Sequence, residues 1–128
     1  MSITWIIGQS NSGKTTLADY LIQFRDDKWV ENYQGKNPYN NCVLLDGDNM
    51  RKVWVDLKYS DDDRCIQNIR IANLAKILDK QGFNVLVASI CPYKKLRKKV
   101  KEITNCKFIY IEGGKKGKEY PFEHPKLY

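Results

Sequence analysis

The sequence has little of what zinc-bound, disulfide-linked or membrane proteins need. It holds one histidine, His124, and four cysteines that lie far apart and form no C-x-x-C pair. Neither a zinc site nor a disulfide framework is therefore indicated. The longest apolar runs, at 3–7 and 85–90, fall short of the roughly 18 residues that a membrane-spanning helix requires. Because Met1 and the residue after it lead straight into the first run, we expect no signal peptide. We therefore expect a cytoplasmic protein with no membrane partner.

Positive charge is plentiful but unevenly placed. The 128 residues, which predict a single domain over 1–128, carry a net charge of +7. Ten lysines or arginines and two glutamates lie within 94–118, so this segment holds most of the excess. Such a cluster suits a polyanion, either a nucleotide substrate or a nucleic acid. The same lysines are also typical of the exposed face of a helix that binds no ligand. The inner side of that helix would carry Leu96, Val100 and Ile103, and we favour this interpretation over a nucleic-acid partner.

Alternating apolar and amphipathic segments predict an α/β fold. The expected strands are 3–7, 42–45, 85–90 and 108–111. The expected helices run from 14 to about 24, from a cap at Ser60 to Gly82, and along 94–101, and a loop is expected at 26–41. The order βαβαβαβ predicts a parallel sheet covered by helices on both faces, a three-layer α/β/α arrangement. Ligands of such sheets bind at the carboxyl ends of the strands.

A phosphate-binding loop follows the first expected strand. Residues 8–15 read Gly-Gln-Ser-Asn-Ser-Gly-Lys-Thr, a complete G-x-x-x-x-G-K-[ST] motif in front of a helical stretch. Such a turn aims several N–H groups and the positive end of a helix dipole at a phosphate, so the fold is expected to be a minimal P-loop NTPase sheet. Lys14 is placed to reach the outer phosphates, and the Thr15 hydroxyl to ligate the Mg²⁺ that accompanies ATP. The predicted ATP-binding residues are Gly8, Gln9, Ser10, Asn11, Ser12, Gly13, Lys14, Thr15 and Thr16.

Two carboxylates follow the second expected strand. Residues 45–51 read Leu-Asp-Gly-Asp-Asn-Met-Arg, at the edge of the sheet where the phosphate loop is expected. Asp46 and Asp48 are suited to orient an attacking hydroxyl, to accept its proton or to hold Mg²⁺ through water. Asp48 fits equally well as a helix N-cap. Arg51 and Arg64, further along, are suited either to clamp a second anion or to form surface ion pairs.

These motifs resemble those of adenylylsulfate kinase, a family that uses ATP to phosphorylate adenosine 5'-phosphosulfate (APS) on its ribose 3'-hydroxyl. The resemblance runs from about Ile3 to Ile111 and extends beyond the phosphate loop and residues 45–51. It implies a P-loop kinase that takes Mg²⁺, ATP and APS and forms 3'-phosphoadenosine 5'-phosphosulfate (PAPS) and ADP. The further matching motifs are an aromatic-Ser-x-x-Asp-Arg stretch at 59–64, Arg-Ile-Ala-x-x-Ala-Lys at 70–76 and Ile-x-Pro-Tyr-[Arg or Lys] at 90–94.

The resemblance also implies a role for individual residues. Lys14 and Asp46 would be catalytic, with Asp46 acting on the 3'-hydroxyl. Arg51 and Arg64 would bind the phosphosulfate, and Tyr59 would stack on the substrate adenine where the family usually has Phe. The implied substrate-binding residues are Asp46, Asp48, Arg51, Tyr59, Arg64, Gln67, Ile90, Pro92 and Tyr93.

Three features depart from the family pattern. Gln67 stands in place of the usual Asn, and Cys91 in place of the Ser of Ile-Ser-Pro-Tyr. After the fourth strand the family continues into a lid over both nucleotides, whereas this sequence has only 112–128. Within it, 120–123 resembles the family's C-terminal tail and 125–128 its lid motif. With most of the lid missing, we expect an open donor site with weak ATP saturation and some ATP hydrolysis.

Two other functions are compatible with the motifs. A kinase of the same fold that acts on a sugar, nucleoside or antibiotic hydroxyl would share the phosphate loop. A weakly active nucleotide-binding or nucleic-acid-binding module would use the lysines of 94–118. The intact Lys14, Thr15 and Asp46 favour an enzyme over such a module. The sequence leaves open whether the chain forms a homodimer.

Overall fold

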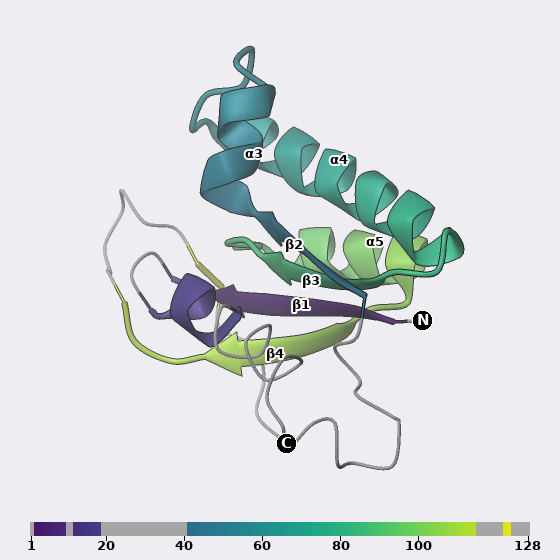
Figure 1. Ribbon diagram of the computed structural model, residues 1–128. Coiled ribbons are helices and arrows are strands. Elements are labelled where there is room, and N and C mark those ends of the chain that lie inside the picture. The colour runs from purple at the N-terminus through teal and green to yellow at the C-terminus, as the bar shows by residue number, and fades with distance from the viewer. Residues whose placement is uncertain (1, 10–11, 19–40, 115–121, 124–128) are drawn as a thin grey trace.

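The computed structural model describes residues 2–9, 12–18, 41–114 and 122–123. Within these residues four parallel strands form one sheet in the order β2-β3-β1-β4 (Figure 1). The strands are β1 (Ile3–Gly8), β2 (Cys42–Asp46), β3 (Asn84–Ala88) and β4 (Lys107–Ile111). The helices that lie wholly within the described residues are α3 (Gly47–Val53), α4 (Asp61–Lys80) and α5 (Lys94–Thr104). This architecture confirms the predicted parallel α/β sheet of the P-loop type.

The inner strand β1 is mainly apolar, as expected of a strand that is covered on both faces. Trp5 and Ile6 are fully buried and belong to two separate core clusters. Trp5 packs in the larger cluster with Ile71 of α4 and residues of α5, while Ile6 packs with Ala18, the last described residue of the helical stretch 14–18. Strands buried in this way carry continuous apolar runs instead of an alternating pattern. The result is a sheet between two helical layers.

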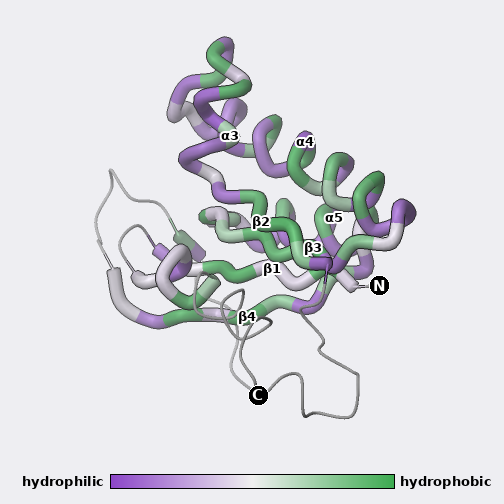
Figure 2. The backbone as a smooth tube through the Cα atoms, viewed as in Figure 1, coloured by the Kyte–Doolittle hydropathy of each residue, from purple (hydrophilic) through white to green (hydrophobic). Residues whose placement is uncertain are grey.

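Helix α4 begins and ends where the sequence indicates. The Ser60 hydroxyl accepts a hydrogen bond of 3.2 Å from the Asp63 amide, and the acidic first turn lies at the positive end of the helix dipole. Gly82, just beyond the helix, has φ of 98°, in the left-handed region that glycine adopts without strain. Figure 2 shows the hydrophilic and hydrophobic positions alternating along α4 and α5, while β1 and β3 are mainly hydrophobic.

The connection between β2 and α4 differs from the prediction, because it contains a further helix, α3. Asp46 ends β2 and is also the N-cap of α3. One of its carboxylate oxygens accepts hydrogen bonds from the amides of Asp48 at 2.9 Å and Asn49 at 3.4 Å. The interpretation of Asp48 as the N-cap was therefore wrong by two residues. This single carboxylate fixes the point at which an extended strand turns into a helix.

Strand β3 also differs, since it ends at Ala88 and not at residue 90. Ser89 lies beyond the ladder and is held by side chains. Its carbonyl oxygen accepts a hydrogen bond of 3.3 Å from the indole of Trp5, and its hydroxyl donates to the Asn68 amide oxygen at 3.2 Å. These contacts hold Ser89 away from the strand ladder. The chain therefore leaves the sheet after Ala88, at the carboxyl ends of the strands.

Several predictions lie outside the described residues: the helix beyond residue 18, the loop at 26–41 and most of the segment 115–128. In the part of the chain that is described, no helix combines the length and the apolar character needed to cross a membrane.

Candidate active site

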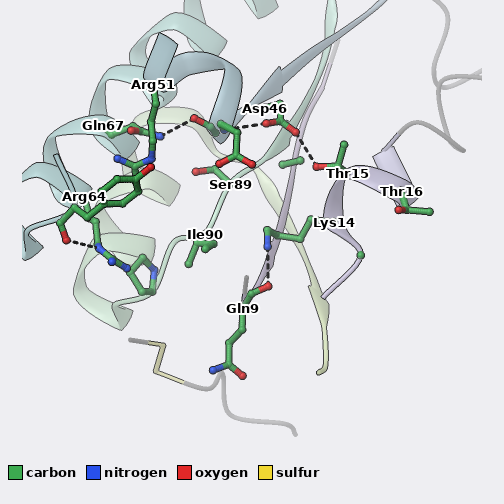
Figure 3. A pocket seen from close by; sticks show the side chains of 16 residues that line it. Gln9, Lys14, Thr15, Thr16, Asp46, Arg51, Arg64, Gln67, Ser89 and Ile90 are labelled. Carbon is green, nitrogen blue, oxygen red and sulfur yellow. Dashed lines mark hydrogen bonds between the residues drawn. The ribbon is translucent and has the colours of Figure 1, made fainter. Parts of the chain in front are cut away.

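The carboxyl ends of the sheet open into a cleft of about 610 Å³. Figure 3 shows Lys14 and Thr15 of the phosphate loop on one side, Arg51 and Arg64 on the other, and Asp46 between them. This is the edge at which parallel α/β sheets bind their ligands. The lining residues are Gln9, Gly13, Lys14, Thr15, Thr16, Asp46, Gly47, Asp48, Arg51, Tyr59, Arg64, Gln67, Ala88, Ser89, Ile90 and Pro92.

The phosphate loop turns tightly between β1 and the following helix. The Ser12 amide donates to the Gln9 carbonyl at 3.1 Å, and the Leu17 amide donates to the Gly13 carbonyl at 3.0 Å, which starts the helix. Gly13 has φ of 99°. A Cβ on Gly8 would lie 2.6 Å from the Ser12 hydroxyl and 2.8 Å from a carbonyl oxygen of β4. Both glycines are therefore required by geometry, one for its backbone conformation and one for close packing.

The Lys14 ammonium folds back over this loop. Its Nζ donates a hydrogen bond of 2.8 Å to the Gln9 carbonyl oxygen (Figure 3). Partial burial lowers the pKa of Lys14, and the charges of Asp48 and, less strongly, Asp46 oppose this shift. Lys14 is thus a cation on the cleft wall that lies within the field of both predicted carboxylates. An ammonium in this position is suited to attract an anionic ligand.

Asp46 connects the two predicted motifs directly. The Thr15 hydroxyl donates a hydrogen bond of 2.7 Å to Oδ2 of Asp46, while Oδ1 accepts the two amides of the first turn of α3. The side chain is buried, with an exposed fraction of 7%. An ionised carboxylate offers about four acceptor sites, so these three donors leave one for a ligand hydroxyl. Asp48 lines the same cleft from an exposed position.

The opposite wall presents two guanidinium groups and an aromatic ring. The Arg51 guanidinium carbon lies 4.2 Å from the centroid of the Tyr59 ring, and Nη1 of Arg51 donates to the Lys58 carbonyl at 2.8 Å. Nε of Arg64 donates to the Tyr59 carbonyl at 2.8 Å. Burial lowers the pKa of Arg51, with Tyr59 acting in the opposite direction. Each guanidinium has five donors, so most of them are left for an anion.

The segment that carries Tyr59 is held in place from α4. The Lys58 amide donates to the Asp63 carboxylate at 2.8 Å, and the Ser60 hydroxyl caps the helix immediately after it. Tyr59 itself is 66% exposed. A large exposed aromatic ring on a well-anchored segment is a suitable surface for stacking a base.

The back of the cleft is a buried polar network. Gln67 is 2% exposed and donates from Nε2 to the Gly47 carbonyl at 3.1 Å, while its Oε1 is buried without a protein partner. Asn68 donates to the carbonyls of Arg64 at 2.8 Å and Ile90 at 3.1 Å. A buried acceptor without a hydrogen bond destabilises the fold. We therefore expect the Gln67 oxygen to accept a hydrogen bond from a ligand or a water molecule.

Some predicted site residues lie elsewhere. Ser10 and Asn11 fall outside the described residues, and Gly8 and Ser12 shape the loop without lining the cleft. Tyr93 is not a lining residue, since its hydroxyl donates a hydrogen bond to the Asp61 carboxylate of α4. The sequence interpretation missed Asn68 and Ser89. The only indication of them in the sequence was that both are polar at positions expected to be buried. The helix pattern places Asn68 in the interior, and the strand pattern does the same for Ser89.

The oxygen atoms at the cleft are suitable ligands for a Mg²⁺ ion. This ion takes few protein ligands and keeps water and phosphate oxygens around it. The Thr15 hydroxyl oxygen supplies one such ligand, and its hydrogen bond of 2.7 Å to the Asp46 carboxylate orients it. Within the described ranges, no group of three or more His, Cys, Asp or Glu side chains is placed to hold a metal ion.

The phosphate loop after β1 and the acid at the end of β2, joined across a parallel sheet, place the chain among the P-loop kinases. The match is more specific than the fold. The family model for adenylylsulphate kinase covers residues 1–113, and the chain belongs to this family.

Individual relatives agree with this assignment. An adenylyl-sulfate kinase from Bacillus velezensis is 37% identical over 103 residues, which are 80% of this chain and 47% of that protein. The chain thus spans about half the length of the curated relatives it matches. A mutant of the Mycobacterium tuberculosis APS kinase CysC superposes with a TM-score of 0.71 at 28% identity, covering 98% of this chain and 80% of that chain. The same enzyme in complex with AMPPNP and APS gives a TM-score of 0.65 at 30% identity over 87% and 61% of the two chains.

Proposed function

We propose that this chain transfers the γ-phosphoryl group of ATP to the ribose 3'-hydroxyl of APS, giving PAPS and ADP. The observation that carries the proposal is the hydrogen bond of 2.7 Å between Thr15 and Asp46, which puts a carboxylate beside the phosphate loop in a cleft whose far wall is cationic. The family assignment and the relative solved with AMPPNP and APS support it.

On the donor side, the loop amides and Lys14 bind the phosphates of ATP. Thr15, with Asp46 near it, would hold Mg²⁺, which neutralises phosphate charge when bound. Lys14 releases the Gln9 carbonyl and turns to the outer phosphates, which are stronger acceptors because they are charged. The loop thereby positions the γ-phosphorus without reorganising its backbone.

On the acceptor side, the adenine of APS stacks on the face of Tyr59 opposite to Arg51, and Arg51 with Arg64 binds the phosphosulfate. The Gln67 oxygen, buried and without a protein partner, accepts a hydrogen bond from a donor group of this nucleotide. Pro92 and Ile90 close the apolar side of the same pocket. Together these groups fix the ribose near Asp46.

Asp46 orients the attacking hydroxyl. The 3'-oxygen forms a bond to the γ-phosphorus while the bond from that phosphorus to the β,γ-bridging oxygen breaks, and the hydroxyl proton passes to a carboxylate. Asp46 has one acceptor site left for this proton, and Asp48 lies on the same wall. General-base assistance of this kind contributes roughly 10² to 10⁴ in rate, and positioning and charge neutralisation supply the remainder.

The test mixes the purified chain with magnesium-ATP and APS and follows PAPS and ADP by chromatography. We expect equal amounts of both products from the wild type, and loss of PAPS formation in Lys14→Ala and Asp46→Asn. Asp62→Asn, an exposed carboxylate on α4 outside the cleft, is the charge-matched control and should keep wild-type turnover. Phosphorylation of a sugar or nucleoside in preference to APS would overturn the proposed acceptor.

A further inference from the structure

The turn that enters α5 forms part of the cleft but lacks a cap of its own. Pro92 lines the cleft, and the N-cap residue of α5, Tyr93, makes no side-chain hydrogen bond to the helix. The first N–H groups of a helix need acceptors, and a helix start without them is unstable. The acceptor comes instead from a distant part of the sequence, at 122–123.

Glu123 binds this turn through both its backbone and its side chain. Its amide donates to the Pro92 carbonyl at 2.6 Å, and its Oε1 accepts a hydrogen bond of 3.2 Å from the Lys94 amide, the first residue of α5. A carboxylate at a helix N-terminus is favoured by the helix dipole as well as by the hydrogen bond. Glu123 therefore supplies the cap that Tyr93 does not.

Arg97 joins the same two segments from the other side. This buried side chain, 7% exposed, donates from Nε to the Cys91 carbonyl at 2.7 Å and from Nη2 to the Pro92 carbonyl at 3.3 Å and to the Glu123 carbonyl. Its guanidinium carbon lies 4.6 Å from the centroid of the Phe122 ring. A buried guanidinium needs several acceptors, and these carbonyls provide them.

Phe122 is in turn fixed against the sheet. Its ring stacks on that of Tyr110 in β4, with centroids 5.7 Å apart and planes 13° from parallel. The guanidinium of Arg97 and the Tyr110 ring both contact Phe122, so the dipeptide connects β4 to the turn at the carboxyl end of β3. The contacts converge on Cys91 and Pro92, directly after Ile90 of the cleft wall.

We propose that Phe122 and Glu123, acting through Arg97, are positioning residues for the acceptor half of the cleft. They hold the wall formed by Ile90 and Pro92 in place and touch neither nucleotide. The inference rests on the proposed function, because it concerns the pocket assigned to APS. The described residues of the phosphate loop, 8–9 and 12–15, share none of these contacts, so the donor side should be insensitive to the dipeptide.

The first measurement is backbone hydrogen exchange with mass spectrometry on the wild type, Phe122→Ala, Glu123→Ala and Glu123→Gln. The alanine variants should exchange faster in a peptide covering 91–97, with no change in β1. Glu123→Gln keeps an oxygen that can accept from the Lys94 amide and should restore most of the protection. Unchanged exchange at 91–97 in both alanine variants would overturn the proposal, whether or not the chain proves to be an APS kinase.

The second measurement is steady-state kinetics on the same proteins. We expect both alanine variants to raise the KM for APS by about 3- to 10-fold, with the KM for ATP unchanged. This is the effect of one lost hydrogen bond in Glu123→Ala and of the lost aromatic and cation–π contacts in Phe122→Ala. Glu102→Ala, on the exposed side of α5, is the control and should match the wild type. Faster exchange with an unaltered KM for APS, or equal increases for both substrates, would also contradict the positioning role. Failure of the wild type to form PAPS would refute the proposed function alone.

Discussion

The Thr15 hydroxyl and the Asp46 carboxylate, 31 residues apart in the sequence, are joined by a hydrogen bond of 2.7 Å. The same carboxylate caps α3 through its other oxygen. Asp46 thus combines a structural role at a helix start with a proposed chemical role toward the acceptor hydroxyl, and the two roles respond differently to substitution.

Asp46→Asn and Asp46→Ala separate these roles. Asn is as good an N-cap as Asp, so we expect Asp46→Asn to unfold in urea at the wild-type midpoint while its turnover falls by roughly 10² to 10⁴. Asp46→Ala should lose similar activity and also about 1 kcal/mol of stability. An Asn variant with wild-type turnover would remove Asp46 from the mechanism.

Gly8→Ala tests the packing of the phosphate loop. The added Cβ would lie 2.8 Å from the Ile111 carbonyl oxygen, a backbone atom with little freedom to move. The loop must shift, and we expect kcat/KM for ATP to fall by about 10- to 100-fold.

The control for this prediction is Gly82→Ala, which lies beyond α4 with φ of 98° and open space around it. It should cost about 1–2 kcal/mol of stability through backbone strain without changing the KM for ATP. Equal kinetics for the two variants would show that the loop tolerates the methyl group.

Arg51→Lys tests the anion clamp. Lysine keeps the charge but loses the planar group that lies over Tyr59 and the fork of donors. We expect the KM for APS to rise by about 10- to 100-fold, as for a lost hydrogen bond to a charged group. The KM for ATP should stay constant. Lys52→Ala, a neighbouring exposed cation outside the cleft, should have no effect on either constant.

Tyr93 gives a pH-dependent prediction. Burial and, after it, the hydrogen bond to Asp61 raise the pKa of Tyr93 to about 12, whereas an unfolded tyrosine titrates near 10. The neutral hydroxyl therefore stabilises the folded state below about pH 10, and this contribution is lost as the pH rises toward 12.

Thermal unfolding and the absorbance of tyrosinate measure this effect. Tyr93→Phe should have a Tm that depends less on pH in this window, and its absorbance titration should lack the tyrosinate transition near pH 12 that the folded wild type shows. Superimposable titration curves for the two proteins would show that the Tyr93 hydroxyl is not protected by Asp61.

The sheet and the two halves of the cleft were predictable because their signals are local. The apolar runs mark the four strands, and the motif at 8–15 fixes one loop by its glycines. Once parallel pairing is assumed, the carboxyl ends of β1 and β2 fall at one edge, so Lys14 and Asp46 were expected to be close. The cap at Ser60 was visible for the same reason, since it depends on residues three positions apart.

The features that sequence analysis missed depend on partners far along the chain. The sequence analysis considered Asp48 as an N-cap, whereas Asp46 caps α3. The contact that Asp46 makes to Thr15, 31 residues away, is not predictable from the local pattern. Ser89 leaves β3 because Trp5 and Asn68 bind it, although its neighbours have strong strand propensity. At Ser89, tertiary hydrogen bonds overrode the local preference for a strand.

The cleft is assembled from four stretches, near residues 9–16, 46–51, 59–67 and 88–92, which only the completed sheet brings together. No single peptide cut from the chain contains all four stretches. We therefore expect nucleotide binding to be lost together with the folded structure, in one cooperative unfolding transition. Nucleotides that occupy the cleft would then protect every layer of the molecule against denaturation, including helices they never contact, in proportion to the logarithm of their concentration.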